Sequence, residues 1–329
     1  VKDCARRVGA DLVGIGAMER FEGAPKQSDP RYIFPEAKTI IGLGFRIHRG
    51  LFRGIEEGTY FAGLPAMGYA NINDVYAPMV LREVSDLLED AGYEAIPYQN
   101  TSVRYGCGVG TPVREGYPKP DVFLHFRIAA YICGMGEIGY SKVFLTPEYG
   151  PRQRFAFVIT DAPLDPDPIY DGPELCDRCM RCVAECPGDA LDADNTVKVT
   201  IAGHKVEWTD LDESRCAAVY QVATREYSPF LPEHVADYID DLKEQPPGQE
   251  RSEMFSYRGS PFGICRTEVP YSANGWESYH HPSAICGARG CMRACMIHLE
   301  EQGKLGNSFE RPFRVRKPWS LNEKDEGET

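Results

Sequence analysis

The stretch CDRCMRCVAECPGDAL, which begins at Cys176, has the cysteine spacing that binds [4Fe-4S] clusters. The gaps are two, two and three residues, and Pro187 follows the last cysteine. In such a run three thiolates wrap a tight loop around one cubane, while the fourth starts a helix, faces away and ligates a second cubane. A structural zinc site more commonly uses two separated ligand pairs. The stretch therefore predicts an iron–sulfur cluster held by this run, namely Cys176, Cys179, Cys182 and Cys186.

A second group of thiols lies farther along, at Cys216 and in the stretch ICGARGCMRACM. The gap between Cys291 and Cys295 repeats the last gap of the first run, although Met296 stands where proline is expected. Cys265 competes for a ligand position. The crossover of the fourth ligand predicts two clusters. One is expected on Cys176, Cys179, Cys182 and Cys295, and the other on Cys186, Cys216, Cys286 and Cys291.

The composition is that of an acidic globular protein. The chain has 329 residues, 12 cysteines and a formal net charge of -13. This charge makes nucleic acid an unlikely partner, because phosphate binding needs a concentrated basic surface. No apolar run approaches the roughly 20 residues of a membrane span, and no signal peptide is visible, so we expect a cytoplasmic protein. A removed leader stays open, because the chain does not begin with methionine. A disulfide framework would not crowd cysteines at two-residue gaps.

Helix and strand patterns alternate in the first half of the chain. The stretch VKDCARRVGA predicts a helix, and DLVGIGAM, AKTIIGLGFRI and RFAFVIT predict strands. DVYAPMVLREVSDLLEDAGYEAIPY predicts an amphipathic helix capped by Gly92 and followed by a strand. The apolar face expected for that helix consists of Met79, Val80, Val84, Leu87, Leu88 and Ala91. The alternation predicts an α/β domain over residues 1–165.

The character of the sequence changes at DAPLDPDPIYDGPE, which is rich in proline and acidic residues. We expect an iron–sulfur domain over residues 166–305. A surface loop is expected at 241–263, where periodicity is weak, and a C-terminal extension at 306–329.

The segment AAYICGMGEIGYSKVFLTPEYGPRQRFAFVITDAPL resembles the cobalamin-dependent reductive dehalogenases, as do GADLVGIG and AGYEAIPYQN. Those enzymes and the related epoxyqueuosine reductases share a Gly-Leu-Gly segment, a TPE-G turn, a strand ending in Thr-Asp and then the cysteine run. The resemblance covers most of the chain. It implies a nitroreductase-like domain that holds base-off cobalamin, followed by a bacterial-ferredoxin-like domain with two [4Fe-4S] clusters.

The same resemblance implies a corrin-binding segment. The residues that match it are Gly134, Gly136, Glu137, Thr146 and Gly150. Glycines here would permit close backbone approach to a large flat ligand, and the alternative is that they serve turn geometry only. No Asp-x-His-x-x-Gly signature occurs, so we expect no lower axial histidine on the cobalt.

Catalytic residues transfer from the family less directly. Tyr76 matches a tyrosine proton donor, and Asn100 matches an asparagine of the dehalogenase pocket. The family carries a basic residue after the glycine segment, which lowers the pKa of the tyrosine. An ungapped match gives Tyr140 at that position and leaves Lys142 as a near neighbour. The alternatives are a core tyrosine at position 76 and a solvated lysine at position 142.

These features favour a reductase that dehalogenates a small, aromatic organohalide. Electrons would come from a ferredoxin or flavodoxin-type donor, and Arg127 with His125 could hold an anionic substrate. Two other interpretations stay open. An epoxyqueuosine reductase acting on tRNA would use an aspartate near Asp121, and a two-cluster electron carrier would bind no corrinoid.

Overall fold

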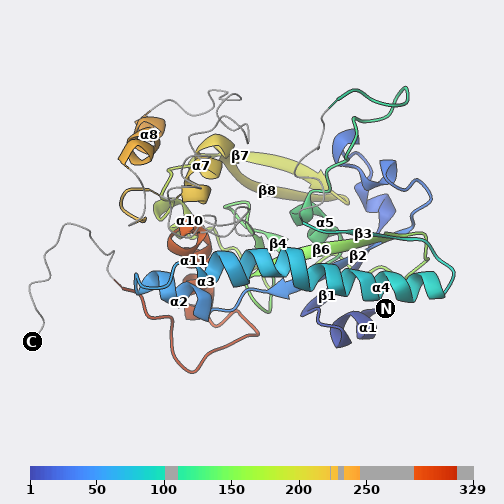
Figure 1. The fold of residues 1–329 in the computed structure, drawn as a ribbon, viewed down its shortest axis with the longest axis horizontal. Coiled ribbons are helices and arrows are strands. Elements are labelled where there is room, and N and C mark those ends of the chain that lie inside the picture. The colour runs from blue at the N-terminus through green and yellow to red at the C-terminus, as the bar shows by residue number, and fades with distance from the viewer. Residues whose placement is uncertain (101–109, 223, 229–232, 245–284, 317–329) are drawn as a thin grey trace, which may run out of the picture.

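The computed structural model describes the chain except residues 101–109, 223, 229–232, 245–284 and 317–329. It has a mixed α/β structure, as the sequence predicts, built around a four-stranded sheet (Figure 1). The strand order is β1-β2-β6-β3, and all neighbouring strands are antiparallel. The strands are β1 (Leu12–Ala17), β2 (Thr39–Arg46), β3 (Ala95–Tyr98) and β6 (Gln153–Thr160). All four were predicted as strands.

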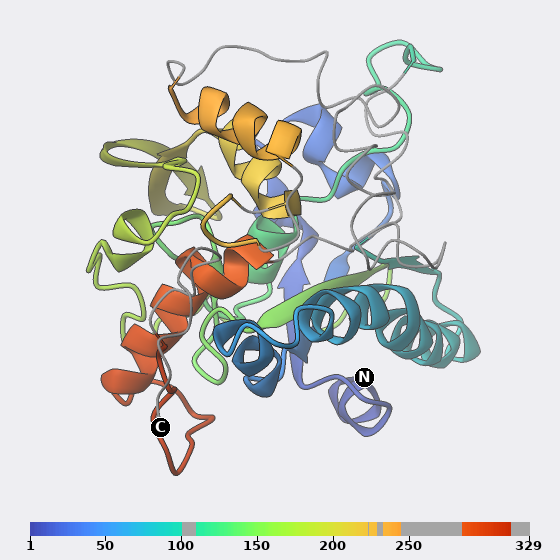
Figure 2. The ribbon, with the colours of Figure 1, turned by 60° about the vertical axis from the view of Figure 1, so that its left-hand side comes forward.

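Helices cover both faces of this sheet (Figures 1 and 2). Helices α1 (Lys2–Arg7) and α4 (Ala77–Asp90) lie on one face, against Leu43 and Val158. Helix α5 (Phe126–Ile132) lies on the other face, against Phe157. Each of these fully buried side chains stabilises the fold by about 1.5–3 kcal/mol. The sheet is thus a rigid platform between two apolar layers.

Helix α4 ends as predicted, at a left-handed glycine. Gly92 has φ 87°, and its amide bonds to the carbonyl of Glu89. The buried stripe runs through Val80, Val84 and Leu88. The expected face was wrong at Met79, Leu87 and Ala91, which are exposed.

Two glycines bring the turn after α5 onto the sheet. A Cβ at Gly14 would lie 2.3 Å from the carbonyl oxygen of Cys133, and one at Gly42 would lie 2.8 Å from the sulfur of Met135. Any side chain at either position would push the turn away. The glycine segment that follows is therefore anchored directly to β1 and β2.

Short helices connect the sheet to its covering layers. Helices α2 (Gly50–Glu56) and α3 (Gly63–Pro65) precede two π-helical turns, η4 (Ala66–Ala70) and η5 (Ile72–Tyr76). The 3-10 turns between β1 and β2 are η1 (Met18–Phe21), η2 (Lys26–Ser28) and η3 (Pro30–Tyr32). A small two-stranded sheet joins β4 (Glu137–Ile138) and β5 (Phe144–Leu145).

The cysteine run lies in a loop around α6 (Arg181–Ala184). Cys186 follows this helix in a turn, so the expectation that it starts a helix was wrong. An unpredicted hairpin comes next, β7 (Leu191–Ile201) and β8 (His204–Leu211). Its Trp208 packs into the apolar layer that contains α5.

The remaining helices are α7 (Glu213–Val222), α8 (Glu233–Glu244), α10 (Ile285–Arg289) and α11 (Cys291–Glu301). Because α8 extends to Glu244, the expected loop was wrong at 241–244, and its remainder, 245–263, lies outside the described residues. Helix α10 packs against α2 and α3. In the described part of the chain no helix is both long enough and apolar enough to span a membrane.

Candidate functional site

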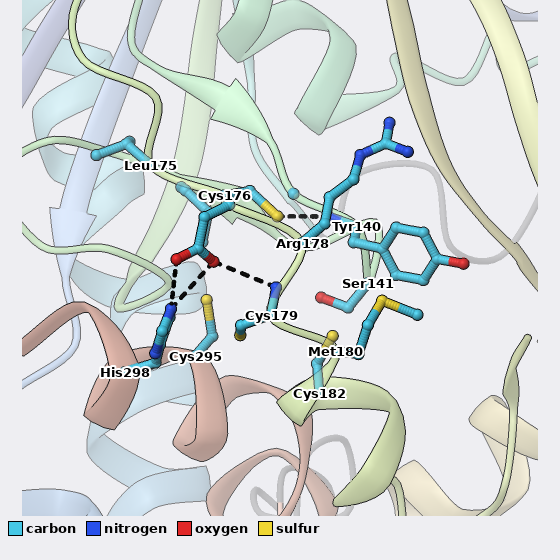
Figure 3. Close-up of a pocket in the computed structure, with 13 residues that line it drawn as sticks. Tyr140, Ser141, Leu175, Cys176, Arg178, Cys179, Met180, Cys182, Cys295 and His298 are labelled. Carbon is cyan, nitrogen blue, oxygen red and sulfur yellow. Dashed lines mark hydrogen bonds and ion pairs between the residues drawn. The ribbon is translucent and has the colours of Figure 1, made fainter. Parts of the chain in front are cut away.

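Four cysteines line one pocket, three from the loop around α6 and one from α11 (Figure 3). They are the predicted first set, Cys176, Cys179, Cys182 and Cys295. Burial, together with the neighbouring thiols of Cys176 and Cys179, raises the pKa of Cys182 to about 11. Burial also raises the pKa of Cys295, again with these thiols contributing. The crossover of the fourth ligand therefore brings together residues more than a hundred positions apart.

Backbone donors support this pocket. The amide of Tyr140 donates to the Cys176 sulfur at 3.2 Å. The Glu137 carboxylate accepts from the amides of Cys176 at 2.5 Å and Leu175 at 3.1 Å. Burial raises the pKa of Glu137, although these two amides act in the opposite direction. Glu137 thus holds the start of the cysteine loop in place.

The other four predicted ligands form a second set, Cys186, Cys216, Cys286 and Cys291. Burial raises the pKa of Cys286, and the thiols of the other three members add to the shift. Burial likewise raises the pKa of Cys291 to about 12 and of Cys216 to about 11. The four thiols therefore lie within electrostatic reach of one another. Cys265, the competitor, lies outside the described residues.

The spread of the thiols fits a cluster better than a single metal ion. Tetrahedral zinc–sulfur bonds of about 2.3 Å place ligand sulfurs roughly 3.8 Å apart. Among the described residues no three cysteine sulfurs lie within 4.8 Å of one another; the group that does meet this limit is Asp177, Cys179 and His298. All described cysteines are free thiols, so no disulfide competes there. Two sets of four separated thiols, with Cys182 buried in the first and Cys286 buried in the second, suit the two predicted cubanes.

The glycine segment packs against the chain itself. A Cβ at Gly134 would lie 2.1 Å from the carbonyl oxygen of Pro168, and one at Gly136 would lie 2.0 Å from that of Leu145. Gly150 pairs with Thr146, with a leucine side chain 3.0 Å from where its Cβ would be. The described contacts of this segment thus serve turn geometry and close packing.

Replacing Gly136 with alanine is expected to destabilise the fold by about 2 kcal/mol or more. The new Cβ would collide with the Leu145 carbonyl, and Gly136 has φ 151°, which L-residues rarely adopt. Urea denaturation followed by circular dichroism would measure the loss. Gly303→Ala is the matched control, since its φ is also positive but nothing lies within 4 Å. Equal stability of both variants would contradict the packing argument.

Tyr140 and Lys142 have structural partners. The Tyr140 hydroxyl donates to the carbonyl oxygens of Asp192 at 2.9 Å and Ala193 at 3.0 Å. Lys142 pairs with Glu213 at 2.9 Å. The ammonium of Lys142 also acts on the pKa of Cys216, which it lowers against the effect of burial. Lys142 therefore lies toward the second cysteine set, whereas Tyr140 supports the first.

Arg127 stands beside the second set. Its residue is exposed, yet desolvation by surrounding protein is the largest influence on its guanidinium and lowers the pKa. The guanidinium is therefore flanked by protein although the residue stays accessible to solvent. Cys216 and Cys291 raise the pKa of Arg127, and the charge of Arg154 lowers it. The name Arg127 site is used below for Arg127, Arg154, Asn73 and Tyr69.

Asn73 and Tyr69 reach this site from the π-helical turns. Arg154 donates to the Asn73 side-chain oxygen at 3.2 Å and lies 4.6 Å from the centre of the Tyr69 ring. The Tyr69 hydroxyl contacts the sulfur of Met292 at 3.3 Å. Met292 directly follows Cys291, a member of the second set. Asn73 is 1% exposed, and its amide nitrogen has no hydrogen-bond partner among the described residues. Such an orphaned donor costs about 1–3 kcal/mol, which a bound ligand can recover.

His125 contributes a neutral imidazole. Burial, together with the charges of Arg127 and Lys142, lowers its pKa to about 4. Its ring accepts from the Ile128 amide at 3.4 Å, so it caps α5. It carries no charge near neutral pH, and the charge of the site comes from the arginines and the lysine.

The two catalytic residues expected from the family lie at the edges of this region. Tyr76 follows Asn73 by three residues and is 45% exposed. Asn100 lies two residues beyond Tyr98, the partner of Phe157, so the chain there runs toward Arg154. Among the described residues, Tyr76 makes no hydrogen bond or ion pair with Asn100, Tyr140 or Lys142. Arg154 and Asn73 were missed; the only signal was that Asn73 shares a helical stretch with Tyr76.

In sequence the chain is similar to two kinds of reductase. No family model matches the chain. A tetrachloroethene reductive dehalogenase of Desulfitobacterium hafniense is 26% identical over 251 residues, which cover 67% of this chain and 44% of that protein. An epoxyqueuosine reductase of Bacillus subtilis is 28% identical over 180 residues, covering 54% of this chain and 42% of its own. The chain thus spans less than half the length of these relatives.

A solved structure agrees with the fold. A catabolic reductive dehalogenase superposes with a TM-score of 0.50 at 16% sequence identity, over 99% of this chain and 41% of that one. At this identity the likeness concerns the fold alone. The sequence matches confirm the resemblance of this chain to the reductive dehalogenases and their epoxyqueuosine reductase relatives.

Proposed function

We propose that this chain is an oxidoreductase that uses two [4Fe-4S] clusters and base-off cobalamin to remove halogen from a small, aromatic organohalide. The observation that carries the proposal is the gathering of eight cysteines into two sets, the second beside the Arg127 site. The dehalogenase relatives supply the reaction class.

Exposure gives the order of the two clusters. Cys179 is exposed, so the first set faces a soluble donor of the ferredoxin or flavodoxin type. Cys286 is buried, and Cys291 lies within electrostatic reach of Arg127. Electrons would therefore enter at the first set and leave from the second toward the Arg127 site.

The Arg127 site fits the family cofactor and a substrate. Arg127 is exposed although protein desolvates its guanidinium, and the buried amide nitrogen of Asn73 has no acceptor among the described residues. We assign these two side chains, with the exposed Tyr76, to the cobalamin and substrate region. When bound, cobalamin supplies a strongly reducing cobalt centre. The glycine segment contributes by fixing its own turns, since Gly134 and Gly136 pack against the carbonyls of Pro168 and Leu145.

The protein side chains then divide the remaining work. Arg127 and Arg154 hold an anionic group of the substrate, because two guanidinium groups in one desolvated region favour negative charge. Tyr76 gives the proton from its hydroxyl to the carbon that loses halide. Arg154 also fixes Asn73 through the hydrogen bond to its side-chain oxygen.

Metal content and halide release test the proposal together. Reconstituted protein should contain cobalt and about eight irons per chain, with a visible corrinoid absorption band. With reduced methyl viologen it should release halide from a halogenated aromatic carboxylate. Iron without cobalt after reconstitution would identify an electron carrier instead.

A second candidate is reductive modification of tRNA. The epoxyqueuosine reductase relative favours it, and the cationic groups of the Arg127 site also suit a phosphodiester. Conversion of epoxyqueuosine in a tRNA stem-loop, with no halide release from aryl halides, would establish this activity and refute dehalogenation.

A further inference from the structure

A fully buried carboxylate links the first half of the chain to the second cysteine set. The Glu56 side chain has 0% exposure and accepts two hydrogen bonds from Arg293, at 2.7 and 2.9 Å. Arg289 lies 3.3 Å from the same carboxylate. Glu56 is the last residue of α2, where the helix dipole disfavours an acid, so the arginines must offset its placement.

Both arginines belong to the helices that carry the cluster ligands. Arg289 ends α10 and Arg293 lies in the first turn of α11, two residues on either side of Cys291. Their side chains are only 3% and 7% exposed. Charges this deeply buried are weakly screened by solvent and salt. Arg289 and Arg293 thus bring two weakly screened charges to positions that flank Cys291 in the sequence.

Charges of both signs are buried together. Among the described residues, Arg289 and Arg293 both face the Glu56 carboxylate. Glu185 also pairs with Arg293, at 3.1 Å, but its side chain is 46% exposed and is screened by water. Burial raises the pKa of Glu56, yet hydrogen bonds from Arg293 and the Arg316 amide outweigh it, so the pKa is lowered and the carboxylate stays ionised.

We propose that Glu56, Arg289 and Arg293 set the reduction potential of the second cluster. Reduction adds one electron, and hence one negative charge, to the cubane and its thiolates. The arginines stabilise that reduced state, and Glu56 opposes them. This inference rests on the proposed function, because it requires a cluster at the second set. The three residues are positioning residues that act through charge.

A purely structural role is the competing explanation. Glu56 could simply tie α2 to α11, since a buried ion pair can hold two elements together without adding net stability. The two explanations predict different signs for the shifts in reduction potential. A purely structural role predicts that substitution of any of the three residues shifts the potential in the same direction. Control by charge predicts opposite effects from removing an acid and removing a base.

Redox titration of the reconstituted protein, monitored by electron paramagnetic resonance, tests this. Glu56→Gln should move the midpoint potential of the second cluster to more positive values. Arg289→Met should move it to more negative values, and Arg289→Lys should leave it near the original. Glu300→Gln is the matched control, since this acid on α11 also pairs with an arginine, Arg49 before α2, but lies roughly 13 Å along the helix from Cys291. It should shift the potential much less.

The outcomes separate the inference from the proposed function. Shifts of the same sign, or no shifts, with about eight irons per chain would overturn the inference alone. About four irons in the unmodified protein would refute the second cluster itself. If Glu56→Gln does not fold, the Arg289 pair still decides the question.

Discussion

Replacing Cys291 with alanine is expected to abolish dehalogenation and to lower the iron content from about eight to about four atoms per chain. Cys291 is a half-buried member of the second set and lies within electrostatic reach of Arg127. Without that thiolate the second cubane loses one of four protein ligands. The first cluster would remain but would have no route to the Arg127 site.

Iron analysis and electron paramagnetic resonance of the reduced protein measure this effect. Cys4→Ala is the matched control, because Cys4 is a free thiol in α1, away from both sets. It should keep about eight irons. A Cys291→Ala protein with full iron content would remove Cys291 from the ligand set and open the place for Cys265.

Tyr76→Phe is expected to slow turnover by about 10²- to 10⁴-fold, the range over which a positioned general acid contributes. The substitution removes only the hydroxyl, and Tyr76 is 45% exposed, so folding should be unaffected. Iron and cobalt contents should stay unchanged. The measurement is the single-turnover rate of halide release.

Tyr60→Phe provides the comparison. Tyr60 is 57% exposed and precedes the same run of helical turns, but no catalytic role is assigned to it. Its rate should match that of the unmodified protein. If Tyr76→Phe retains full turnover, Tyr76 is not the proton donor, and the search moves to Tyr69.

Local patterns predicted the framework well. The strands β1, β2 and β6 are apolar runs long enough to be read without tertiary information, and Gly92 ends α4 through its own backbone. The cysteine sets also followed from spacing, because the crossover of the fourth ligand is a property of the run itself. The structure brings each predicted set together, and the clusters themselves stay a prediction.

Other features depend on contacts far apart in the chain. Glu56 and Arg293 are 237 residues apart, and Arg154 and Asn73 are 81 apart, so no local pattern reveals either pair. The hairpin β7–β8 was not predicted, although Val197, Val199 and Ile201 alternate before its glycine turn. The glycine segment stays a predicted corrin-binding segment, and its described contacts at Gly134 and Gly136 are with the chain itself.

Helix α11 carries one ligand from each set, Cys291 and Cys295, a single turn apart. A helical turn rises about 5.4 Å, and a hydrogen-bonded helix does not stretch. Helix α11 would therefore keep the distance between the two predicted cubanes fixed. The rate of electron tunnelling between the two clusters would then not depend on small movements of the first half of the chain relative to the part that carries the cysteines. Such motions would change only the distance from the second cluster to the Arg127 site. That last electron transfer would then control the overall rate.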